Sequence, residues 1–253
     1  MSAKFIANPN QKGGVGKTTT ASTLAYCLAL RNRRVLLVDF DPQGQCSTVL
    51  GLPQEPGVFN VLINPSADIR QWIRVTGRAG LDLLPGDRTT ATAQIVINAG
   101  PEPSPMDYIR QVFKSISKEY DYLIFDTAPS VGGIQERAIF AADIVLIPTA
   151  TEFLSLEGLG QMVETLTRLR DKHHWSGQLL GILPTFFDEQ TRESKQSLDQ
   201  LYGAFPETTL SPIHRATILR ECAAEGLTIF EKDPQSRSAR EYEELSRLVV
   251  RMS

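Results

Sequence analysis

A glycine-rich segment near the N-terminus has the residue types and spacing that bind phosphate groups. It reads Gln11-Lys12-Gly13-Gly14-Val15-Gly16-Lys17-Thr18-Thr19-Thr20, and it lies between an apolar run and a helical pattern that begins near Gly16. Glycines let backbone N–H groups turn toward phosphate oxygens, and the start of a helix adds unpaired donors. Lys17 can reach the β- and γ-phosphates of a nucleotide, and the Thr18 hydroxyl can bind Mg²⁺. The alternative is a flexible turn with an unrelated lysine, but the strand before the loop and the helix after it favour phosphate binding.

Two further segments place aspartates at the ends of apolar runs. The first is Val38-Asp39-Phe40-Asp41-Pro42-Gln43-Gly44-Gln45, and the second is Tyr122-Leu123-Ile124-Phe125-Asp126-Thr127-Ala128-Pro129-Ser130. Because doubly wound sheets bind ligands at the carboxyl ends of their strands, these aspartates should face the phosphate loop. Alternation along an extended chain points Asp39 and Asp41 to the same side. Asp126 is expected to hold Mg²⁺, often through water, while simple turn or cap roles remain open for Asp41 and Asp126.

The loop departs from the usual pattern in one respect. A glycine normally stands five positions before Gly16, but this chain has Gln11 there, followed by a second lysine, Lys12. In this feature the sequence resembles the deviant Walker A family of P-loop ATPases, and within it the ParA/Soj-type partition ATPases. The resemblance implies ATP as the nucleotide and Lys12 as a residue that crosses a dimer interface to the partner's phosphates. A lysine there would neutralise charge on the transferred phosphoryl group, whereas the alternative for Lys12 is an exposed loop charge.

The resemblance also implies roles for residues outside the loop. Asp41 would position the attacking water, Asp39 would lie near Mg²⁺, and residues 127–130 would form a second switch. Glu152 would contact the partner's nucleotide, with a helix cap as the alternative, and adenine is expected near residues 183–187 and 212–215. The candidate catalytic residues are thus Lys12, Lys17 and Asp41, and the metal-binding residues are Thr18, Asp39 and Asp126. The nucleotide-binding candidates are Lys12, Gly13, Gly14, Val15, Gly16, Lys17, Thr18, Thr19, Glu152 and Pro212.

A DNA contact is a further implication of the resemblance, because ParA-type dimers bind DNA without sequence preference. Such binding rests on Lys and Arg side chains that neutralise phosphates. The candidates are Arg215, Arg220, Arg240, Arg247 and Arg251. The last three fall on a predicted helix from about 236 to 252, on the side opposite an apolar stripe of Tyr242, Leu245, Leu248, Val249 and Met252. A solvated helix face is the alternative for each arginine.

The hydrophobicity pattern predicts the elements that position these residues. Continuous apolar runs indicate strands buried on both faces, at Phe5–Ala7, Val35–Val38, Tyr122–Phe125, Ile144–Ile147 and Leu179–Leu183. Helical spacing of apolar residues occurs in 106–116 and 159–169. The alternation predicts an α/β fold, with a doubly wound, mostly parallel sheet and helices on both faces, as one domain over residues 1–253. Residues 51–104, rich in glycine and proline, are expected to form an irregular insertion.

Composition limits the partners and the compartment. The 253 residues include 26 Lys+Arg and 29 Asp+Glu, a net charge of −3, so any DNA contact needs a local patch. Three scattered cysteines predict neither a disulfide framework nor a cysteine metal site, and they fit a reducing cytosol. The cysteine spacing excludes the nitrogenase iron protein branch of the family, which needs cysteines to hold an iron–sulfur cluster, because no cysteine lies between Asp126 and Cys222. Secretion, a membrane span and an N-terminal helix-turn-helix domain are not expected, since only a few residues precede the first strand.

The resemblance to ParA/Soj-type ATPases implies a cytoplasmic, nucleoid-associated ATPase that forms a homodimer with ATP, binds DNA and positions a plasmid, a chromosome or another cargo. Hydrolysis is expected to be weak alone and stimulated by a ParB-like or other adaptor protein, with no membrane partner. A MinD-like ATPase that cycles on membranes is the alternative, in which the last helix would anchor in lipid. A third hypothesis is a small-molecule P-loop kinase, which Lys12 and Asp41-Pro42-Gln43-Gly44 disfavour.

Overall fold

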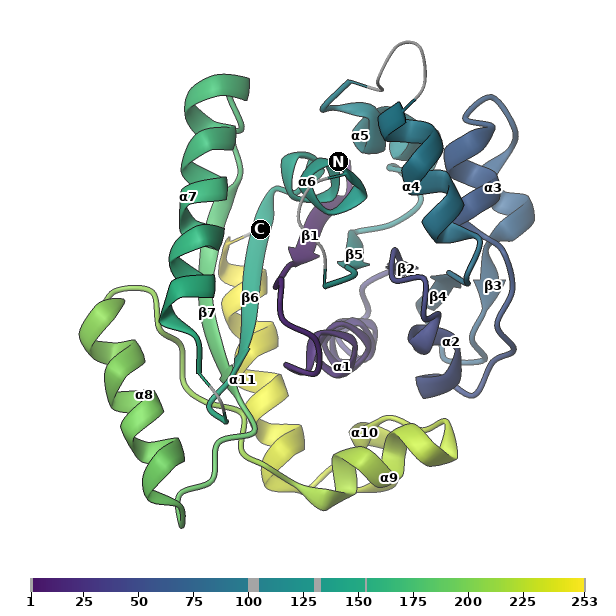
Figure 1. Cartoon of the computed structure of the whole chain (residues 1–253). Helices are drawn as coiled ribbons and strands as arrows, with labels where there is room; N and C mark the ends of the chain where they lie inside the picture. The colour runs from purple at the N-terminus through teal and green to yellow at the C-terminus, as the bar shows by residue number, and fades with distance from the viewer. Residues whose placement is uncertain (1, 100–104, 130–132, 153, 253) are drawn as a thin grey trace.

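The computed structural model describes residues 2–99, 105–129, 133–152 and 154–252, and within them seven strands form one sheet (Figure 1). The strand order is β3-β4-β2-β5-β1-β6-β7. All neighbouring strands run parallel except β3 and β4, which are antiparallel. The prediction of a doubly wound, mostly parallel α/β fold is therefore confirmed. The strands are β1 (Lys4–Asn8), β2 (Val35–Asp39), β3 (Arg74–Val75), β4 (Leu81–Leu84), β5 (Tyr122–Asp126), β6 (Ile144–Ala150) and β7 (Gln178–Thr185).

Helices cover both faces of the sheet. The first face carries α1 (Lys17–Ala29) and α11 (Arg237–Met252), whose apolar residues share one hydrophobic core. The second face carries α4 (Thr90–Ala99), α6 (Gly133–Ala141) and α7 (Leu156–His173), which share another. The remaining helices are α2 (Gln45–Val49), α3 (Val58–Ile63), α5 (Tyr108–Val112), α8 (Arg192–Ala204), α9 (Thr217–Glu225) and α10 (Ile229–Lys232), with 3₁₀ turns η1 (Ile69–Trp72) and η2 (Phe113–Ser115).

The central strands form where the sequence is continuously apolar. Every residue of β2, β5 and β6 is buried, as a parallel sheet covered by helices on both sides requires. The last helix, α11, buries Tyr242, Leu245 and Val249 of its predicted apolar stripe in the core that it shares with α1. This stripe is therefore a packing face of the fold. No helix of the described residues is both long enough and apolar enough to cross a membrane.

Residues 51–104 do not form the irregular insertion that the glycine and proline content predicts. Their described part contains α3, η1, β3, β4 and α4, and β4 extends the sheet by pairing with β2. The apolar run of β4 is only four residues long, and Asp82 interrupts it. The Asp82 carboxylate accepts a hydrogen bond of 2.9 Å from the Tyr120 hydroxyl, which lets a polar residue lie in this strand.

The helix expected over residues 106–116 is also shorter than its pattern. It divides into α5 and the 3₁₀ turn η2, which follow one another without a gap in the chain. The apolar residues of this segment, Ile109, Val112, Phe113 and Ile116, are buried in the core all the same. The helical spacing therefore predicted correctly which residues are buried, but the regular helix is shorter than the spacing predicted.

Strand register brings the candidate site together. In β1, β5 and β2, which are neighbours, Asn8 pairs with Asp126 and Asp126 pairs with Asp39. All three strands end at these residues, so their side chains meet at the carboxyl edge of the sheet. The glycine-rich loop leaves β1 at the same edge, which is where doubly wound folds bind ligands.

Candidate nucleotide-binding site

The glycine-rich loop forms one wall of a cavity of about 530 Å³. Gly14 and Gly16 both have left-handed backbone conformations, with φ of 71° and 81°, which glycine adopts without strain. Helix α1 begins directly after Gly16, so its unpaired N–H groups face the loop. The cavity is lined by Gly13, Gly14, Gly16, Lys17, Thr18, Thr19, Asp41, Pro42, Gln43, Gln45, Ala128, Pro129 and Phe186. Six of the predicted loop residues therefore lie together with Asp41 around one cavity.

Lys17 is buried at the base of this cavity. Its Nζ donates a hydrogen bond of 2.9 Å to the backbone oxygen of Lys12, so the side chain lies back over the loop. Burial lowers the pKa of the Lys17 amine, while the charges of Asp126 and Asp41 act in the opposite direction. A bound phosphate would give this ammonium a stronger, charged acceptor than a backbone carbonyl.

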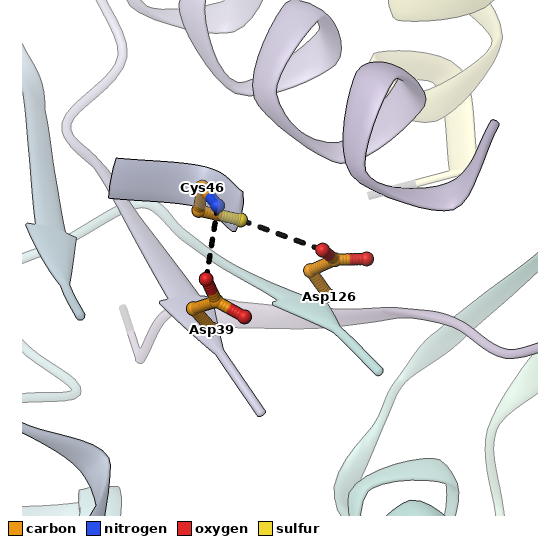
Figure 2. A group of neighbouring side chains, drawn as sticks. All are labelled: Asp39, Cys46 and Asp126. Atoms are coloured by element: carbon orange, nitrogen blue, oxygen red, sulfur yellow. Dashed lines mark hydrogen bonds between the residues drawn. The ribbon is translucent and has the colours of Figure 1, made fainter. Parts of the chain in front are cut away.

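The Thr18 hydroxyl and the two buried aspartates form a compact polar group. Thr18 Oγ1 donates a hydrogen bond of 2.6 Å to Oδ2 of Asp126. Figure 2 shows Asp39 and Asp126 on neighbouring strands with Cys46 of α2 above them. The backbone N–H of Cys46 donates to Asp39 Oδ2 at 2.9 Å, and its thiol donates to Asp126 Oδ2 at 3.5 Å. Residues of four elements, α1, β2, α2 and β5, thus meet at one point.

The electrostatics of this group favour a bound cation. Burial, and then the charge of Asp126, raises the pKa of the Asp39 carboxyl well above its usual range. Burial also raises the pKa of Asp126, to about 6. Asp126 Oδ1 is buried with no hydrogen-bond partner among the described residues, so it is an acceptor available to a cation or to its water. The Thr18 hydroxyl and the Asp126 carboxylate therefore fit Mg²⁺, which prefers oxygen ligands and retains water molecules.

The two aspartates of the first acidic segment do not share one environment. Asp39 ends β2 and is fully buried, whereas Asp41 lies beyond the strand and lines the cavity. Asp41 still lies near Asp39, because its backbone N–H donates a hydrogen bond of 3.1 Å to Asp39 Oδ1, and the charge of Asp41 contributes to the raised pKa values of both Asp39 and Asp126. Asp41 Oδ1 accepts a hydrogen bond of 2.9 Å from the Gln43 N–H, which is a turn role, while the residue also borders the space for the phosphates. Both of the roles considered for Asp41 are thus compatible with its position.

Lys12 and Glu152 lie on a different side of the loop. Lys12 is exposed and borders a second cavity, of about 370 Å³, together with Ser155 at the start of α7. Ser155 caps α7 by accepting a hydrogen bond of 3.1 Å from the Gly158 N–H, so Glu152 is not the cap. The Glu152 carboxylate instead forms an ion pair with Arg215. This pair joins a predicted nucleotide residue to a predicted DNA residue.

Pro212 lines a third cavity, of about 260 Å³, rather than the one beside the glycine-rich loop. Of the two ranges where adenine is expected, 183–187 and 212–215, only the first contributes a residue to the lining of the loop cavity, and that residue is Phe186. Phe186 has φ of 54°, an unusual conformation for a bulky residue, and a Cβ built on Gly16 would lie 3.4 Å from its ring. Strain at such a residue is typical of ligand sites. Cys46 is the other residue that sequence reasoning missed, because cysteine spacing gave no signal for it.

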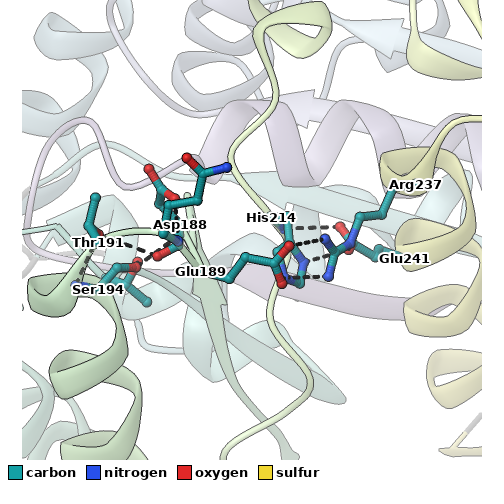
Figure 3. Close-up of polar contacts among 9 residues, drawn as sticks. Asp188, Glu189, Thr191, Ser194, His214, Arg237 and Glu241 are labelled. Atoms are coloured by element: carbon teal, nitrogen blue, oxygen red, sulfur yellow. Dashed lines mark hydrogen bonds and ion pairs between the residues drawn. The ribbon is translucent and has the colours of Figure 1, made fainter.

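A polar network connects the segment after Pro212 to helix α11 (Figure 3). His214 Nδ1 and Glu241 Oε1 are 2.6 Å apart, and the His214 backbone N–H donates to Glu241 Oε2 at 3.0 Å. Arg237 completes the network, since its guanidinium contacts His214 Nε2 at 2.6 Å and Glu189 at 3.2 Å. Tyr242 follows Glu241 in α11, and its hydroxyl lies 3.4 Å from the hydroxyl of Thr20 in α1. Helix α11 therefore contacts both α1 and the segment around His214.

The candidate DNA-binding arginines are all exposed, but they do not form one group. Arg240, Arg247 and Arg251 project from α11, and Arg247 pairs with Glu243 at 3.4 Å. Arg215 lies next to His214 and is paired with Glu152, whereas Arg220 belongs to α9. The arginines of α11 are thus the candidates that share one surface.

Of the second switch segment, residues 127–129 are described and Ser130 lies outside the described residues, as does Phe153 next to Glu152.

Comparisons with known proteins cover nearly the whole chain. A family model, the AAA domain, matches residues 3–178. The sporulation initiation inhibitor protein Soj of Bacillus subtilis (strain 168) is 36% identical over 252 residues, covering 98% of each chain. The chromosome partitioning protein ParA of Myxococcus xanthus (strain DK1622) is 34% identical over 254 residues, covering 98% of this chain and 88% of that one.

A solved structure extends the comparison to the site. The cobyrinic acid a,c-diamide synthase from Mycobacterium smegmatis, with bound ATP analog and magnesium, is 28% identical. Its TM-score is 0.83, and the match covers 98% of this chain and 95% of that chain. The loop with its two lysines, Lys12 and Lys17, lies within residues 3–178, which the family model matches. On this evidence the chain belongs to the family of ParA/Soj-type partition ATPases.

Proposed function

We propose that this protein is an ATP- and Mg²⁺-dependent switch that pairs with a second copy when ATP is bound and then binds DNA without sequence preference. Hydrolysis of ATP, weak alone and stimulated by an adaptor protein of the ParB kind, would end both associations. The protein would act in the cytoplasm on the nucleoid and position a plasmid, a chromosome or another cargo. The observation that carries the proposal is the Thr18–Asp126 contact of 2.6 Å beside the buried amine of Lys17.

The chain's own residues account for binding and hydrolysis in the following way. Lys17 would exchange the carbonyl of Lys12 for phosphate oxygens, and the N–H groups at the start of α1 would donate to the same phosphates. The Thr18 hydroxyl and the Asp126 carboxylate would hold Mg²⁺, which screens the charge of the phosphate oxygens when bound. Asp41, which borders the cavity, would hold the attacking water in line with the γ-phosphate.

Pairing of two copies would follow from the position of Lys12. Its exposed side chain lies on the cavity next to the start of α7, away from the chain's own phosphate cavity. A second molecule's γ-phosphate on this side of the loop would contact the Lys12 ammonium, which would stabilise the charge of the transition state. Pairing would also double the arginine surface of α11, so that weak contacts combine.

Sedimentation velocity with ATP, with ADP, and with ATP plus DNA tests the switch directly. We expect a dimer with ATP, a monomer with ADP, and a faster DNA-bound species only with ATP. Lys12→Ala should retain ATP in equilibrium dialysis and lose both the dimer and its hydrolysis, whereas Lys195→Ala, on exposed α8, should behave as wild type. A Lys12→Ala protein that dimerises normally would assign Lys12 to the loop surface alone.

The DNA arm of the proposal rests on the arginines of α11. The double variant Arg247→Glu/Arg251→Glu should lose most DNA binding and retain ATP binding, while Arg88→Glu/Arg192→Glu makes the same charge change elsewhere. Wild-type affinity should hardly differ between two unrelated duplexes and should fall steeply between about 50 and 200 mM salt. Fluorescence anisotropy with ATP measures both. Unchanged DNA binding by the α11 variant would assign the role to Arg215 and Arg220. If the wild-type protein does not bind DNA at all, the membrane-cycling alternative is favoured. Flotation with liposomes would detect membrane binding.

A further inference from the structure

A buried arginine connects three segments that are far apart in the chain. Arg78, in the turn between β3 and β4, has only 8% of its side chain exposed. Its Nη1 donates a hydrogen bond of 2.9 Å to the backbone oxygen of Leu50, and its Nη2 donates one of 2.8 Å to that of Gly226. Its Nε lies 3.0 Å from both carboxylate oxygens of Glu231 in α10. The planar fork of a guanidinium makes these contacts together, whereas the point charge of a lysine cannot span them.

The two carbonyl groups that Arg78 binds are the ends of two helices. Leu50 is the C-terminal cap of α2, and Gly226 is the C-terminal cap of α9. Because the C-terminal end of a helix carries partial negative charge, two such ends repel each other, and a cation between them offsets the repulsion. The ends are in close contact, since a Cβ built on Gly226 would lie 2.5 Å from the Cα of Gly51. Arg78 therefore holds the ends of α2 and α9 against each other.

The other end of α2 forms part of the nucleotide cavity. Gln45, the first residue of α2, lines this cavity, and the N–H of the preceding Gly44 donates a hydrogen bond of 2.9 Å to the backbone oxygen of Asp41. With five residues, α2 is too short to be stable as an isolated helix, so the groups that bind its two ends fix its position. A nucleotide in the cavity would act on one end of α2, while Arg78 holds the other.

Beyond Arg78, the connection leads to the candidate DNA-binding arginines. Helix α9 carries Arg220 and begins two residues after Arg215. Helix α10, which carries Glu231, precedes α11 in the chain. The guanidinium carbon of Arg78 also lies 5.8 Å from the centre of the Tyr26 ring in α1, the helix that starts at the glycine-rich loop. Arg78 thus joins the wall of the nucleotide cavity to the segment that bears these arginines (Figure 1).

We propose that Arg78 is a positioning residue that couples the nucleotide cavity to α9. Because Arg78 caps α2 and α9 together, a nucleotide that fixes α2 also fixes α9 and the arginine that it carries. The inference rests on the proposed binding of ATP, and it depends on neither DNA binding nor dimerisation. An arginine with a structural role alone would stabilise α9 equally with and without nucleotide, so the response of α9 to nucleotide distinguishes the two roles.

Hydrogen–deuterium exchange of the full-length protein, with and without a saturating non-hydrolysable ATP analogue and Mg²⁺, tests the coupling. In wild type we expect the analogue to slow exchange in the glycine-rich loop and, by at least about fivefold, in α9. Arg78→Lys keeps the charge and loses the fork, so it should retain the protection of the loop and lose that of α9. The matched control is Arg74→Lys in β3, where the Arg74 guanidinium donates to Glu55 at 2.7 Å. This control should respond as wild type does.

Two controls and a second variant keep the outcome clear. Circular dichroism melts verify that each variant is folded, and sedimentation of the same samples verifies that each has the oligomeric state of wild type. Arg78→Gln, which can still donate to one of the two carbonyls, replaces Arg78→Lys if the latter does not fold, and the same loss of protection in α9 is expected. Protection of α9 that persists in the folded variant overturns the proposal. So does a wild-type protein whose loop is protected and whose α9 is not, although ATP binding then stands. Absence of protection in the wild-type loop overturns the proposed ATP binding and this inference with it.

Discussion

The hydroxyl of Thr18 donates a hydrogen bond of 2.6 Å to the carboxylate of Asp126, although 108 residues separate the two in the chain. The contact exists because β1 and β5 are neighbours in register, with Asn8 beside Asp126, and because α1 begins at Lys17 directly after the loop. The first turn of a helix and the end of a strand thus bring together the two oxygen-bearing side chains that we propose as ligands of Mg²⁺.

The raised pKa of Asp126 predicts a dependence of stability on pH. In the ligand-free protein this carboxyl ionises near pH 6, against about 4 in an unfolded chain, so the folded state binds the extra proton between these values. The free energy of unfolding should therefore fall as the pH rises from 4 to 6, by an amount of the order of 2–3 kcal/mol. Urea unfolding without Mg²⁺ or nucleotide measures it. Asp126→Asn should flatten this slope and Asp199→Asn, on exposed α8, should not; an unchanged slope in Asp126→Asn contradicts the assignment.

Lys17→Ala should weaken ATP binding by roughly 10- to 100-fold, because it removes a charged hydrogen bond to the phosphates. Isothermal titration with a non-hydrolysable ATP analogue measures the affinity. Lys195→Ala controls for the loss of one positive charge at a distant surface. Equal affinity in Lys17→Ala and wild type would mean that this amine does not contact the nucleotide.

The two roles considered for Asp41 predict different outcomes for two substitutions. If Asp41 holds the attacking water, Asp41→Ala and Asp41→Asn should both lower kcat, by about 10²- to 10⁴-fold, and leave the affinity for ATP nearly unchanged. The Asn side chain can still accept the hydrogen bond from the Gln43 N–H, so it preserves the turn. Phosphate release measures the rate of hydrolysis and decides between the two roles. A wild-type rate in Asp41→Asn together with a low rate in Asp41→Ala would show that Asp41 acts as a turn residue.

His214 should stabilise the protein through its contact with Glu241. Both side chains are largely buried, with 15% and 14% exposed, so removal of the imidazole leaves the carboxylate without one of its donors. His214→Ala should therefore lower the free energy of unfolding by about 1–3 kcal/mol. The matched control is His173→Ala, on the exposed surface of α7. Similar urea midpoints for the two variants would show that the network adds little.

The sequence predicted the strands that have a continuous run of buried apolar residues and missed those whose apolar run is short or interrupted. Apolar runs at β1, β2, β5, β6 and β7 were sufficient because a strand covered on both faces needs no polar positions. Strands β3 and β4, at one end of the sheet, escaped notice, since β3 has two residues and β4 contains Asp82. Such short strands depend on their neighbours in the tertiary structure, which local patterns do not report.

The site shows the same division. Loop glycines, Lys17 and Thr18 follow from local chemistry, whereas the contact of Cys46 with Asp126 depends on how a short helix packs against a strand 80 residues away. Phe186 takes its unusual backbone conformation where β7 ends against the loop, with the Thr185 hydroxyl bonded to the backbone oxygen of Val15. Such positions are fixed by packing between distant segments, and no spacing in the sequence encodes them.

The place of β1 in the sheet has a consequence for how the chain is made. Its two neighbours are β5 and β6, which begin at Tyr122 and Ile144, so the first strand to leave the ribosome waits for both partners. Contacts over such separations form slowly, because a long loop must close before they stabilise the chain. A nascent chain that ends before Tyr122 holds the glycine-rich loop but no part of β5, the strand that pairs with β1 along its whole length. ATP can therefore assist folding only after half of the protein has been synthesised.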